Sequence, residues 1–192
     1  MKIGILGGSF DPVHNGHIEM ACFCKQKFNL DKIMFLPLGE PPHKKNITDK
    51  ELRIKMLQVA IENYEDFFVS RLEVDRPGKT YTYETIKCLL EKCDDDFYYI
   101  IGGDTINTLE TWFNVYELFK ILKFIVVDRC NYNRDNVDKL IKSGAKLYFA
   151  DHVGQNVSST AIRNNVKKGE NIDNLVPEKV KELILQNELY KN

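Results

Sequence analysis

Short apolar runs alternate along this chain with longer stretches in which apolar residues recur every three or four positions. The short runs predict six buried strands, at residues 2–6, 32–36, 67–74, 97–101, 124–127 and 146–149. Helical spacing predicts helices at residues 15–28 and 81–91, and two more that begin near Ser158 and at Pro177. Strands that alternate with helices are typical of βαβ units and of a mostly parallel sheet.

A capping signal precedes a further helical stretch. Thr48 and Glu51 are spaced as in a capping box, in which each side chain bonds the backbone N–H of the other residue. Leu52, Met56 and Val59 then follow at helical spacing. We therefore predict an amphipathic helix that is capped by Thr48.

The predicted fold is α/β, with a Rossmann-like, mostly parallel sheet flanked by helices. A C-terminal helical segment from about residue 158 contains no strand, and it could close over one edge of the sheet. No internal repeat, low-complexity tract or linker divides the 192 residues. We therefore expect a single domain that spans residues 1–192.

The composition narrows the possible partners and the compartment. With 27 Lys and Arg against 28 Asp and Glu, the chain has no general field for nucleic acid or for an anionic membrane, so we expect neither as a partner. No signal peptide or membrane-spanning run is apparent. Five cysteines without a paired framework indicate reduced thiols, and we expect a cytoplasmic protein.

Residues with chemical potential follow several of the predicted strands. In open parallel sheets, ligands bind beyond the carboxyl ends of the strands, which all lie at one edge. The residues that follow successive strands are His14 and His17, His43 and Lys44, Gly102 to Asp104, Arg129, and Ser158 to Thr160. The sequence therefore predicts one site at this edge of the sheet.

The glycines after the first strand suit a phosphate site. Gly7 and Gly8 let the backbone turn tightly and let a ligand approach, and the next helix presents unpaired N–H groups. By themselves they are also compatible with an ordinary turn. The dinucleotide fingerprint G-x-G-x-x-G is absent, and Gly78-Lys79-Thr80 is not a Walker A loop because Glu73 occupies its first glycine position.

Two histidines start the next helix. His14 and His17 lie on nearly the same side of a first helical turn, and Gly16 between them leaves room for a ligand. Ordinary surface histidines remain one reading, and a zinc site another. Cys22 and Cys24 would have to complete that site, but they point in different directions on a helix. The favoured interpretation is a pair of N–H donors that stabilise negative charge on phosphate.

Two motifs make the chain similar to a known family. Residues 8–17, GSFDPVHNGH, resemble the GSFDPxHxGH signature of the nucleotidyltransferase superfamily, and residues 157–163 resemble its ISSTxIR motif. Within the superfamily, the chain resembles the bacterial nicotinate-mononucleotide adenylyltransferases over nearly its full length. Further matching segments are Pro42-His43-Lys44, Tyr81-Thr82, Ile101 to Asp104, Leu109 with Trp112, Val176-Pro177 and Leu189-Tyr190. The segments Cys130-Asn131 and His152 to Gly154 depart from the family's pattern.

The resemblance implies a reaction. The adenylyl group of ATP would pass to nicotinate mononucleotide, giving nicotinate adenine dinucleotide and pyrophosphate in NAD biosynthesis. No covalent intermediate and no general base are needed, so catalysis would rest on alignment and charge stabilisation. Magnesium is expected to arrive with ATP, and no dedicated protein ligand for a metal can be named.

The resemblance also implies roles for individual residues. His14 and His17 would be the catalytic pair. The implied ATP-binding residues are Gly8, Ser9, Phe10, Gly16, Gly102, Asp104, Ser159, Thr160 and Arg163. The implied acceptor-binding residues are His43, Lys44, Thr82, Trp112 and Arg129. Trp112 would stack on the pyridine ring, and backbone N–H groups near Thr82 would bind the carboxylate.

Other interpretations of these residues stay open at this point. The serines could simply cap a helix, Asp104 could cap the short helix that follows it, and Trp112 could be a core aromatic residue. The chain could also be a sister enzyme that uses nicotinamide mononucleotide or pantetheine phosphate. A non-catalytic nucleotide sensor is a third possibility, although such a protein would not need both histidines. The oligomeric state is left open by the sequence.

Overall fold

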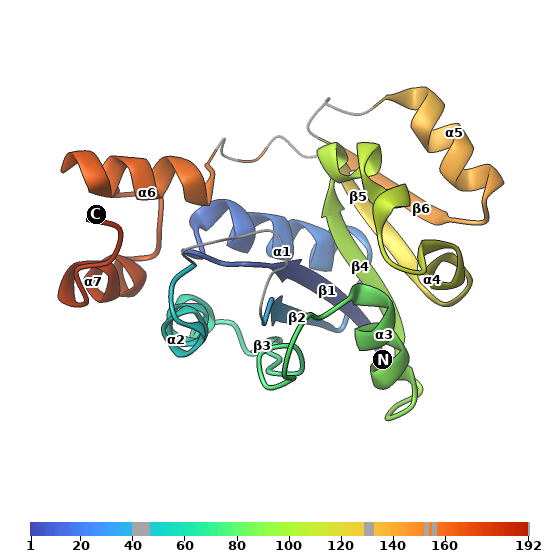
Figure 1. Ribbon diagram of the computed structural model, residues 1–192, viewed down its shortest axis with the longest axis horizontal. Coiled ribbons are helices and arrows are strands. Elements are labelled where there is room, and N and C mark those ends of the chain that lie inside the picture. Colours follow the sequence, from blue (N-terminus) through green and yellow to red (C-terminus); the bar gives the residue numbers. More distant parts are fainter. Residues whose placement is uncertain (40–46, 129–132, 152–153, 155–156, 192) are drawn as a thin grey trace.

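One parallel sheet organises the chain. The computed structural model describes residues 1–39, 47–128, 133–151, 154 and 157–191. In these residues a six-stranded sheet has the order β3-β2-β1-β4-β5-β6, and each neighbouring pair is parallel (Figure 1). The strands are β1 (Lys2–Gly8), β2 (Lys32–Pro37), β3 (Phe67–Val69), β4 (Asp96–Gly102), β5 (Lys123–Asp128) and β6 (Lys146–Asp151). This is the strand order of Rossmann folds, and the predicted fold class is confirmed.

The order of the strands places a switch point between β1 and β4. The chain builds outward from β1 to β3, then crosses to the other side of β1 and builds outward again from β4 to β6. Leu6 of β1 pairs with Ile100 of β4, so Gly8 and Gly102 end neighbouring strands at the same edge. Ligands of open α/β sheets bind at such a point.

Helices cover both faces of the sheet. On one face, α1 (Asn15–Lys27) and α2 (Lys50–Ile61) contribute to a core cluster that contains Leu6 and Ile100. On the other face, residues of α3 (Thr82–Leu90), α4 (Val115–Ile121) and α5 (Arg134–Lys142) cluster with the alternate strand residues. Successive side chains along each strand therefore point alternately into two separate hydrophobic cores, one on each face of the sheet. Two short 3₁₀ helices, η1 (Gly103–Asn107) and η2 (Leu109–Thr111), follow β4.

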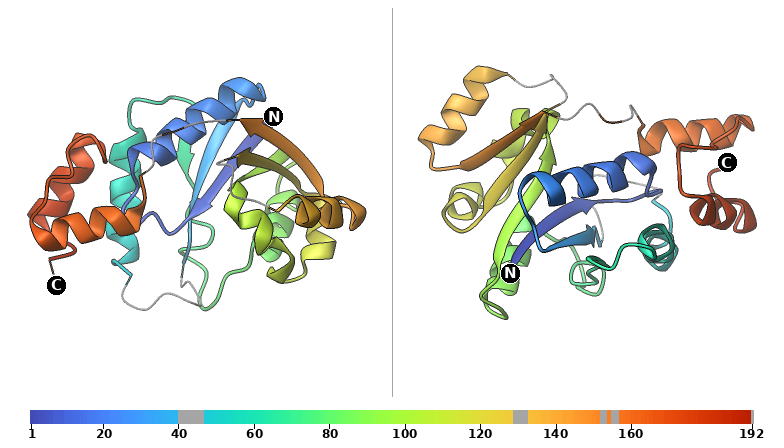
Figure 2. Two further views of the ribbon diagram at one scale, coloured as in Figure 1. Left: turned by 90° about the horizontal axis from the view of Figure 1, so that it is seen from above. Right: turned by 180° about the vertical axis from the view of Figure 1, so that it is seen from behind.

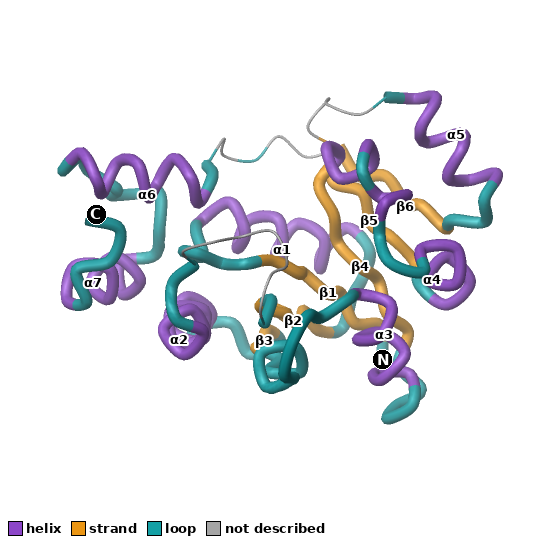
Figure 3. The backbone as a smooth tube through the Cα atoms, in the orientation of Figure 1, coloured by secondary structure: helices purple, strands orange, loops and turns teal. Residues whose placement is uncertain are grey.

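The C-terminal helices stand beside the sheet. In all views α6 (Ser159–Lys168) and α7 (Glu178–Gln186) lie at the end of the molecule opposite α5 (Figures 2 and 3). Helix α7 packs against α2, and buried Val180 and Ile184 belong to the same core cluster as Met56 and Leu57 of α2. The C-terminal segment is therefore helical, as predicted.

Three local predictions were wrong or incomplete. Asp49 caps α2 in place of Thr48, because its carboxylate accepts from the backbone N–H groups of Glu51 and Leu52. The strand predicted at residues 67–74 ends at Val69, where the chain leaves β2 and turns. Helices α4 and α5 were not predicted, since α4 is short and α5 is mostly polar.

Candidate functional site

A cleft of about 900 Å³ opens where β1 and β4 end. Its wall contains residues from both halves of the chain, including the glycine that ends each of these two strands. Eight of the predicted site residues line it: Gly8, His14, His17, Thr82, Gly102, Asp104, Trp112 and Ser159. The fold therefore brings together, in one cavity, motifs that lie 150 residues apart in the sequence.

The two histidines form one unit at the start of α1. His14 is the N-cap residue, and its backbone N–H donates to Nδ1 of His17 at 3.2 Å. The two imidazole rings stack with their centroids 3.6 Å apart. Because Nδ1 of His17 accepts, a neutral ring carries its proton on Nε2. In this tautomer the Nε2 proton of His17 is available for the predicted donor role.

Close packing shapes the glycine-rich approach to this helix. A Cβ on Gly7 would collide with the Tyr99 hydroxyl, so a larger residue at this position requires the Tyr99 side chain to move. Phe10 has a positive φ of 48° and is 1% exposed. Its ring contacts the His17 ring edge-on at 5.0 Å and lies against Gly8. Phe10 is therefore a packing residue behind the cleft.

The second motif reaches back to the first. Ser158 caps α6 by accepting from the Ala161 backbone N–H, as the capping alternative predicts. The Ser159 hydroxyl donates to the Pro12 carbonyl at 2.9 Å, and Nη1 of Arg163 donates to the Asp11 carbonyl at 2.7 Å. These bonds place the N-terminus of α6 beside that of α1. Two helix N-termini then open on the same cleft, an arrangement that attracts anions.

Several predicted residues support the site from outside the cleft lining. The residues Ser9, Phe10, Gly16, Thr160 and Arg163 do not line the cavity. Each of them lies beside a residue that does, or, in the case of Arg163, is bonded to the Asp11 carbonyl in the segment that leads into His14. Arg163 also donates to the Thr160 hydroxyl at 3.1 Å. These two bonds use part of the five donors that a guanidinium carries. His43, Lys44 and Arg129 lie outside the described residues.

The opposite wall of the cleft is aromatic. Trp112 is half-buried: its ring packs edge-on against Tyr99 at 5.8 Å beside a core cluster, and it also lines the cleft, so the alternative of a core aromatic residue holds in part. Tyr81 stacks at an angle on exposed Phe113, 4.6 Å away. Thr82 begins α3, whose N-terminus has no side-chain cap. A ligand with a flat ring can therefore lie against Trp112, with a polar substituent at the N-terminus of α3.

A buried carboxyl stands behind this wall. Glu73 is 2% exposed, and it accepts from the hydroxyls of Thr85 at 2.8 Å and Thr80 at 3.2 Å. Burial raises the pKa of Glu73 above its usual range. In the sequence Glu73 is conspicuous only because it occupies the first glycine position of a Walker A loop, and its place as a buried carboxyl was missed.

A buried arginine supports the histidine side and was also missed. Arg53 is 1% exposed, and burial lowers the pKa of its guanidinium. It donates to the carbonyl oxygens of Ser9, Gly39 and Thr48. A signal for it exists in the sequence, because Arg53 shares the spacing of buried Met56 and Ala60 on one face of α2.

Features of a metal site or of a membrane-spanning helix are absent from the described residues. They contain no group of three His, Cys, Asp or Glu side chains that could hold a metal ion. In the cleft, Asp104 is the one carboxylate among the described lining residues. Among all the residues that the structure describes, no helix is long and apolar enough to cross a membrane.

Comparisons with known proteins agree with this geometry. A family model described as cytidylyltransferase-like matches residues 5–165. A probable nicotinate-nucleotide adenylyltransferase of Clostridium novyi is 40% identical, with 99% of each chain covered. One from Clostridium botulinum is 38% identical, with 97% of this chain and 98% of the relative covered. The structure of Plasmodium falciparum nicotinic acid mononucleotide adenylyltransferase complexed with NaAD superposes with a TM-score of 0.84 at 23% identity, covering 99% and 97% of the two chains.

Proposed function

Because this chain belongs to the cytidylyltransferase-like family, and within it to the nicotinate-nucleotide adenylyltransferases, we propose that it transfers the adenylyl group of ATP to nicotinate mononucleotide. The products are nicotinate adenine dinucleotide and pyrophosphate. One observation carries the proposal: a single cleft joins an anion-attracting wall at His14, His17 and Ser159 to an aromatic wall at Trp112.

The reaction is a direct displacement. An oxygen of the acceptor's phosphate attacks the α-phosphorus of ATP, the bond from that phosphorus to the bridging oxygen of the β-phosphate breaks, and pyrophosphate leaves. The attacking oxygen is already anionic, so the protein needs no base. Its contribution is to align the two substrates and to stabilise charge that develops at the phosphorus.

The histidine side of the cleft suits the triphosphate. The N-termini of α1 and α6 supply backbone N–H groups and the favourable ends of two helix dipoles. Nε2 of His17 donates to a phosphate oxygen, and the buried imidazole of His14 is stacked beside it. Asp104 is exposed at the end of β4, where it accepts from the ribose hydroxyls of the adenosine.

The aromatic side suits the pyridine ring. Trp112 stacks on the ring of nicotinate mononucleotide, and the uncapped N-terminus of α3 at Thr82 binds its carboxylate through backbone N–H groups. An amide in place of the carboxylate presents an NH₂ to these donors. We therefore expect the acid to be preferred over the amide.

Magnesium belongs to the substrate in this proposal. A Mg²⁺ ion commonly keeps several waters and binds through substrate phosphates, so it needs few protein ligands. The described lining residues, with one carboxylate, fit an ion that arrives on ATP. When bound there it neutralises charge on the phosphates.

A pyrophosphate-release assay tests the proposal. The purified chain is given ATP, magnesium and one acceptor at a time: nicotinate mononucleotide, nicotinamide mononucleotide or pantetheine phosphate. We expect the highest kcat/KM with nicotinate mononucleotide, and mass spectrometry should detect nicotinate adenine dinucleotide. Preference for another acceptor would assign the chain to a sister reaction. Release with none of them, with ATP binding intact, would indicate a nucleotide sensor.

A further inference from the structure

The loop that leads into the histidines is held from outside on several sides. This histidine loop, residues 9–14, has its carbonyl oxygens bonded by Arg53 at Ser9, by Arg163 at Asp11 and by Ser159 at Pro12. The residue after the loop is held as well, since the Asn15 backbone N–H donates to the Leu175 carbonyl at 3.0 Å. The position of the loop is therefore set by α2 and by the C-terminal segment together.

A carboxylate inside the loop has two donors. Asp11 is 5% exposed. Its Oδ1 accepts from the Tyr190 hydroxyl at 2.7 Å, and its Oδ2 accepts from the Thr48 backbone N–H at 3.3 Å. A buried carboxylate that loses such a donor keeps its desolvation cost without the compensating bond. The loop can then relax only by moving Asp11 toward another donor or toward water.

The stronger of these donors comes from the far end of the chain. Tyr190 lies two residues before residue 192, beyond α7, and in Figure 1 the C-terminal end lies between α6 and α7. Its ring packs against the core cluster that also holds Phe10 and Val13. Burial and the nearby Asp11 charge raise the pKa of the Tyr190 hydroxyl, so it remains a donor at neutral pH.

The contact is coupled to the histidines through neighbours in the loop. Asp11 follows Phe10, whose ring lies edge-on against His17, and it precedes His14 by three residues. A shift of Asp11 therefore moves the Phe10 ring, which supports His17, and the backbone that leads into His14. Because transfer at phosphorus depends on alignment, a small displacement there affects turnover more than substrate binding.

We propose that Tyr190 is a positioning residue for adenylyl transfer: by donating to Asp11, it holds the histidine loop where His14 and His17 face the cleft. This inference rests on the proposed function for its kinetic test. It gives the last residues of the chain a role in turnover that neither signature motif contains.

Two tyrosine variants test the proposal. Tyr190→Phe removes only the hydroxyl, and Tyr116→Phe, at a residue 55% exposed on α4, is the matched control. We expect kcat to fall about tenfold in Tyr190→Phe with little change in the KM for ATP, a fraction of the roughly 100-fold that a 1 Å misplacement can cost. A kcat within twofold of that of Tyr116→Phe, at a temperature where both are folded, would overturn it.

A double-mutant cycle separates positioning from general stability. If Tyr190 acts through Asp11, the loss of kcat in Tyr190→Phe/Asp11→Asn is smaller than the product of the two single losses. Independent, multiplying losses would contradict the proposal. Removal of residues 190–192, which also removes the packed ring, should lower kcat at least as much as Tyr190→Phe, whereas removal of residues 191–192 should leave kcat unchanged.

A readout without activity keeps this inference distinct from the proposed function. In protein labelled with ¹⁵N-histidine, the imidazole signals of His14 and His17 should shift in Tyr190→Phe and stay in place in Tyr116→Phe. Unchanged signals would refute the positioning role even in an active enzyme. Conversely, if the signals shift in Tyr190→Phe while the wild-type protein releases no pyrophosphate, the loop contact is supported and the proposed function fails.

Discussion

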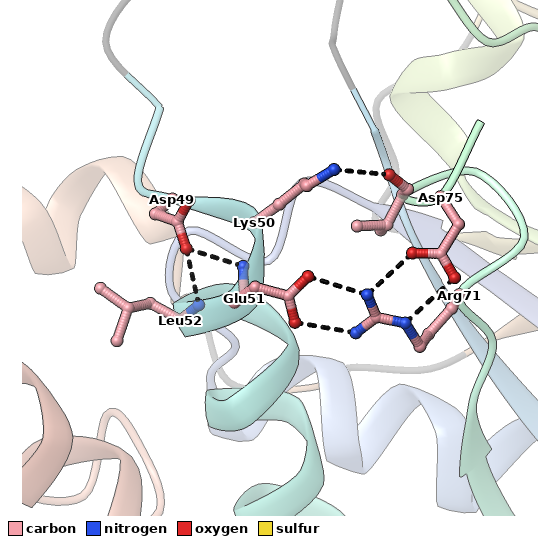
Figure 4. Close-up of polar contacts among 7 residues, drawn as sticks. Asp49, Lys50, Glu51, Leu52, Arg71 and Asp75 are labelled. Carbon is pink, nitrogen blue, oxygen red and sulfur yellow. Dashed lines mark hydrogen bonds and ion pairs between the residues drawn. The ribbon is translucent and has the colours of Figure 1, made fainter. Parts of the chain in front are cut away.

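Two arginines near the first turn of α2 make similar numbers of bonds in opposite surroundings. Arg53 is buried and donates to three carbonyl oxygens. Arg71, whose side chain is 43% exposed, holds the carboxylate of Glu51 with two bonds of 2.8 Å and also binds Asp75 (Figure 4). Its partners carry full charges, whereas those of Arg53 are neutral.

Burial decides which of the two sets of hydrogen bonds contributes more to the stability of the fold. Exposed ion pairs gain little, because water and salt screen the charges and two long side chains must be ordered. A buried guanidinium has lost its water, so each carbonyl that it binds is needed to offset that loss. The pKa shifts follow the same division: Glu51 and Asp75 raise the pKa of Arg71, whereas burial lowers that of Arg53.

The two arginines support different walls of the cleft. Arg53 holds the histidine loop at Ser9. The Arg71 network and the bond from Lys50 to the Val74 carbonyl hold residues 70–75, the segment that carries Glu73 behind the aromatic wall (Figure 4). The wall where phosphorus reacts is thus braced by buried bonds. The wall that holds the acceptor ring is braced partly at the surface and tolerates more change.

The largest effect is expected from Arg53→Met. The variant leaves three carbonyl oxygens without their donor and removes the cation beside Asp11, so we expect a loss of about 3–5 kcal/mol in the free energy of unfolding. Urea denaturation measures it, with Lys55→Met on the exposed face of the same helix as control. A midpoint equal to that of the control would mean that the buried bonds contribute no more than exposed ones.

Arg53 also shows how far the sequence could predict the site. The strands, the helices around the two motifs and the edge at which the cleft opens follow from periodicity, glycine chemistry and a resemblance, and the predicted family is confirmed. The bracing residues could not be assigned partners, because Asp11 and Tyr190 are 179 residues apart and only the tertiary fold joins them. Short polar α5 lacks the apolar periodicity on which a helix prediction depends.

The next largest effect concerns chemistry on the histidine side. His17→Ala removes a donor whose bond strengthens as charge develops, so kcat should fall about 10²–10³-fold, roughly 2.7–4 kcal/mol. His17→Gln separates this role from helix capping, because its side-chain oxygen can accept from the His14 N–H as in a capping box. A kcat within a few-fold of wild type in both variants would remove His17 from the catalytic pair.

A smaller effect is expected on the aromatic side. Trp112→Ala should lower kcat/KM about tenfold for both pyridine nucleotides, because aromatic stacking contributes roughly 0.5–1.5 kcal/mol beyond burial and is alike for acid and amide. The ratio of the two kcat/KM values should stay near that of wild type. If the ratio collapses, Trp112 also positions the carboxylate site, and the tolerance inferred for this wall is wrong.

Glu73, behind the same wall, should make the stability of the protein depend on pH. Its pKa in the folded protein is raised by burial, so its contribution to stability is complete below the unfolded pKa and is lost as pH rises through the folded value. Glu73→Gln cannot ionise. We expect the free energy of unfolding of wild type to decrease, relative to this variant, as pH rises above the ordinary glutamate pKa of about 4.3. Glu65→Gln, at an exposed residue, should show no such trend, and a constant difference for Glu73→Gln would refute the prediction.

The smallest effect is expected from Arg71→Met. Arg71 holds the pKa of Glu51 and Asp75 below their usual values, so the pairs stabilise the fold above the unfolded pKa of these carboxyls and lose this contribution only as pH falls through the lowered values. At neutral pH and physiological salt, screening leaves the exposed network little to contribute. The urea midpoint should therefore match wild type, and a small deficit should appear when salt is lowered. Asp49 still caps α2, and Lys50 and Glu73 still hold residues 70–75. A loss as large as that of Arg53→Met would show that exposure does not separate the two arginines, and the division between a stiff phosphate wall and a tolerant acceptor wall would have to be abandoned.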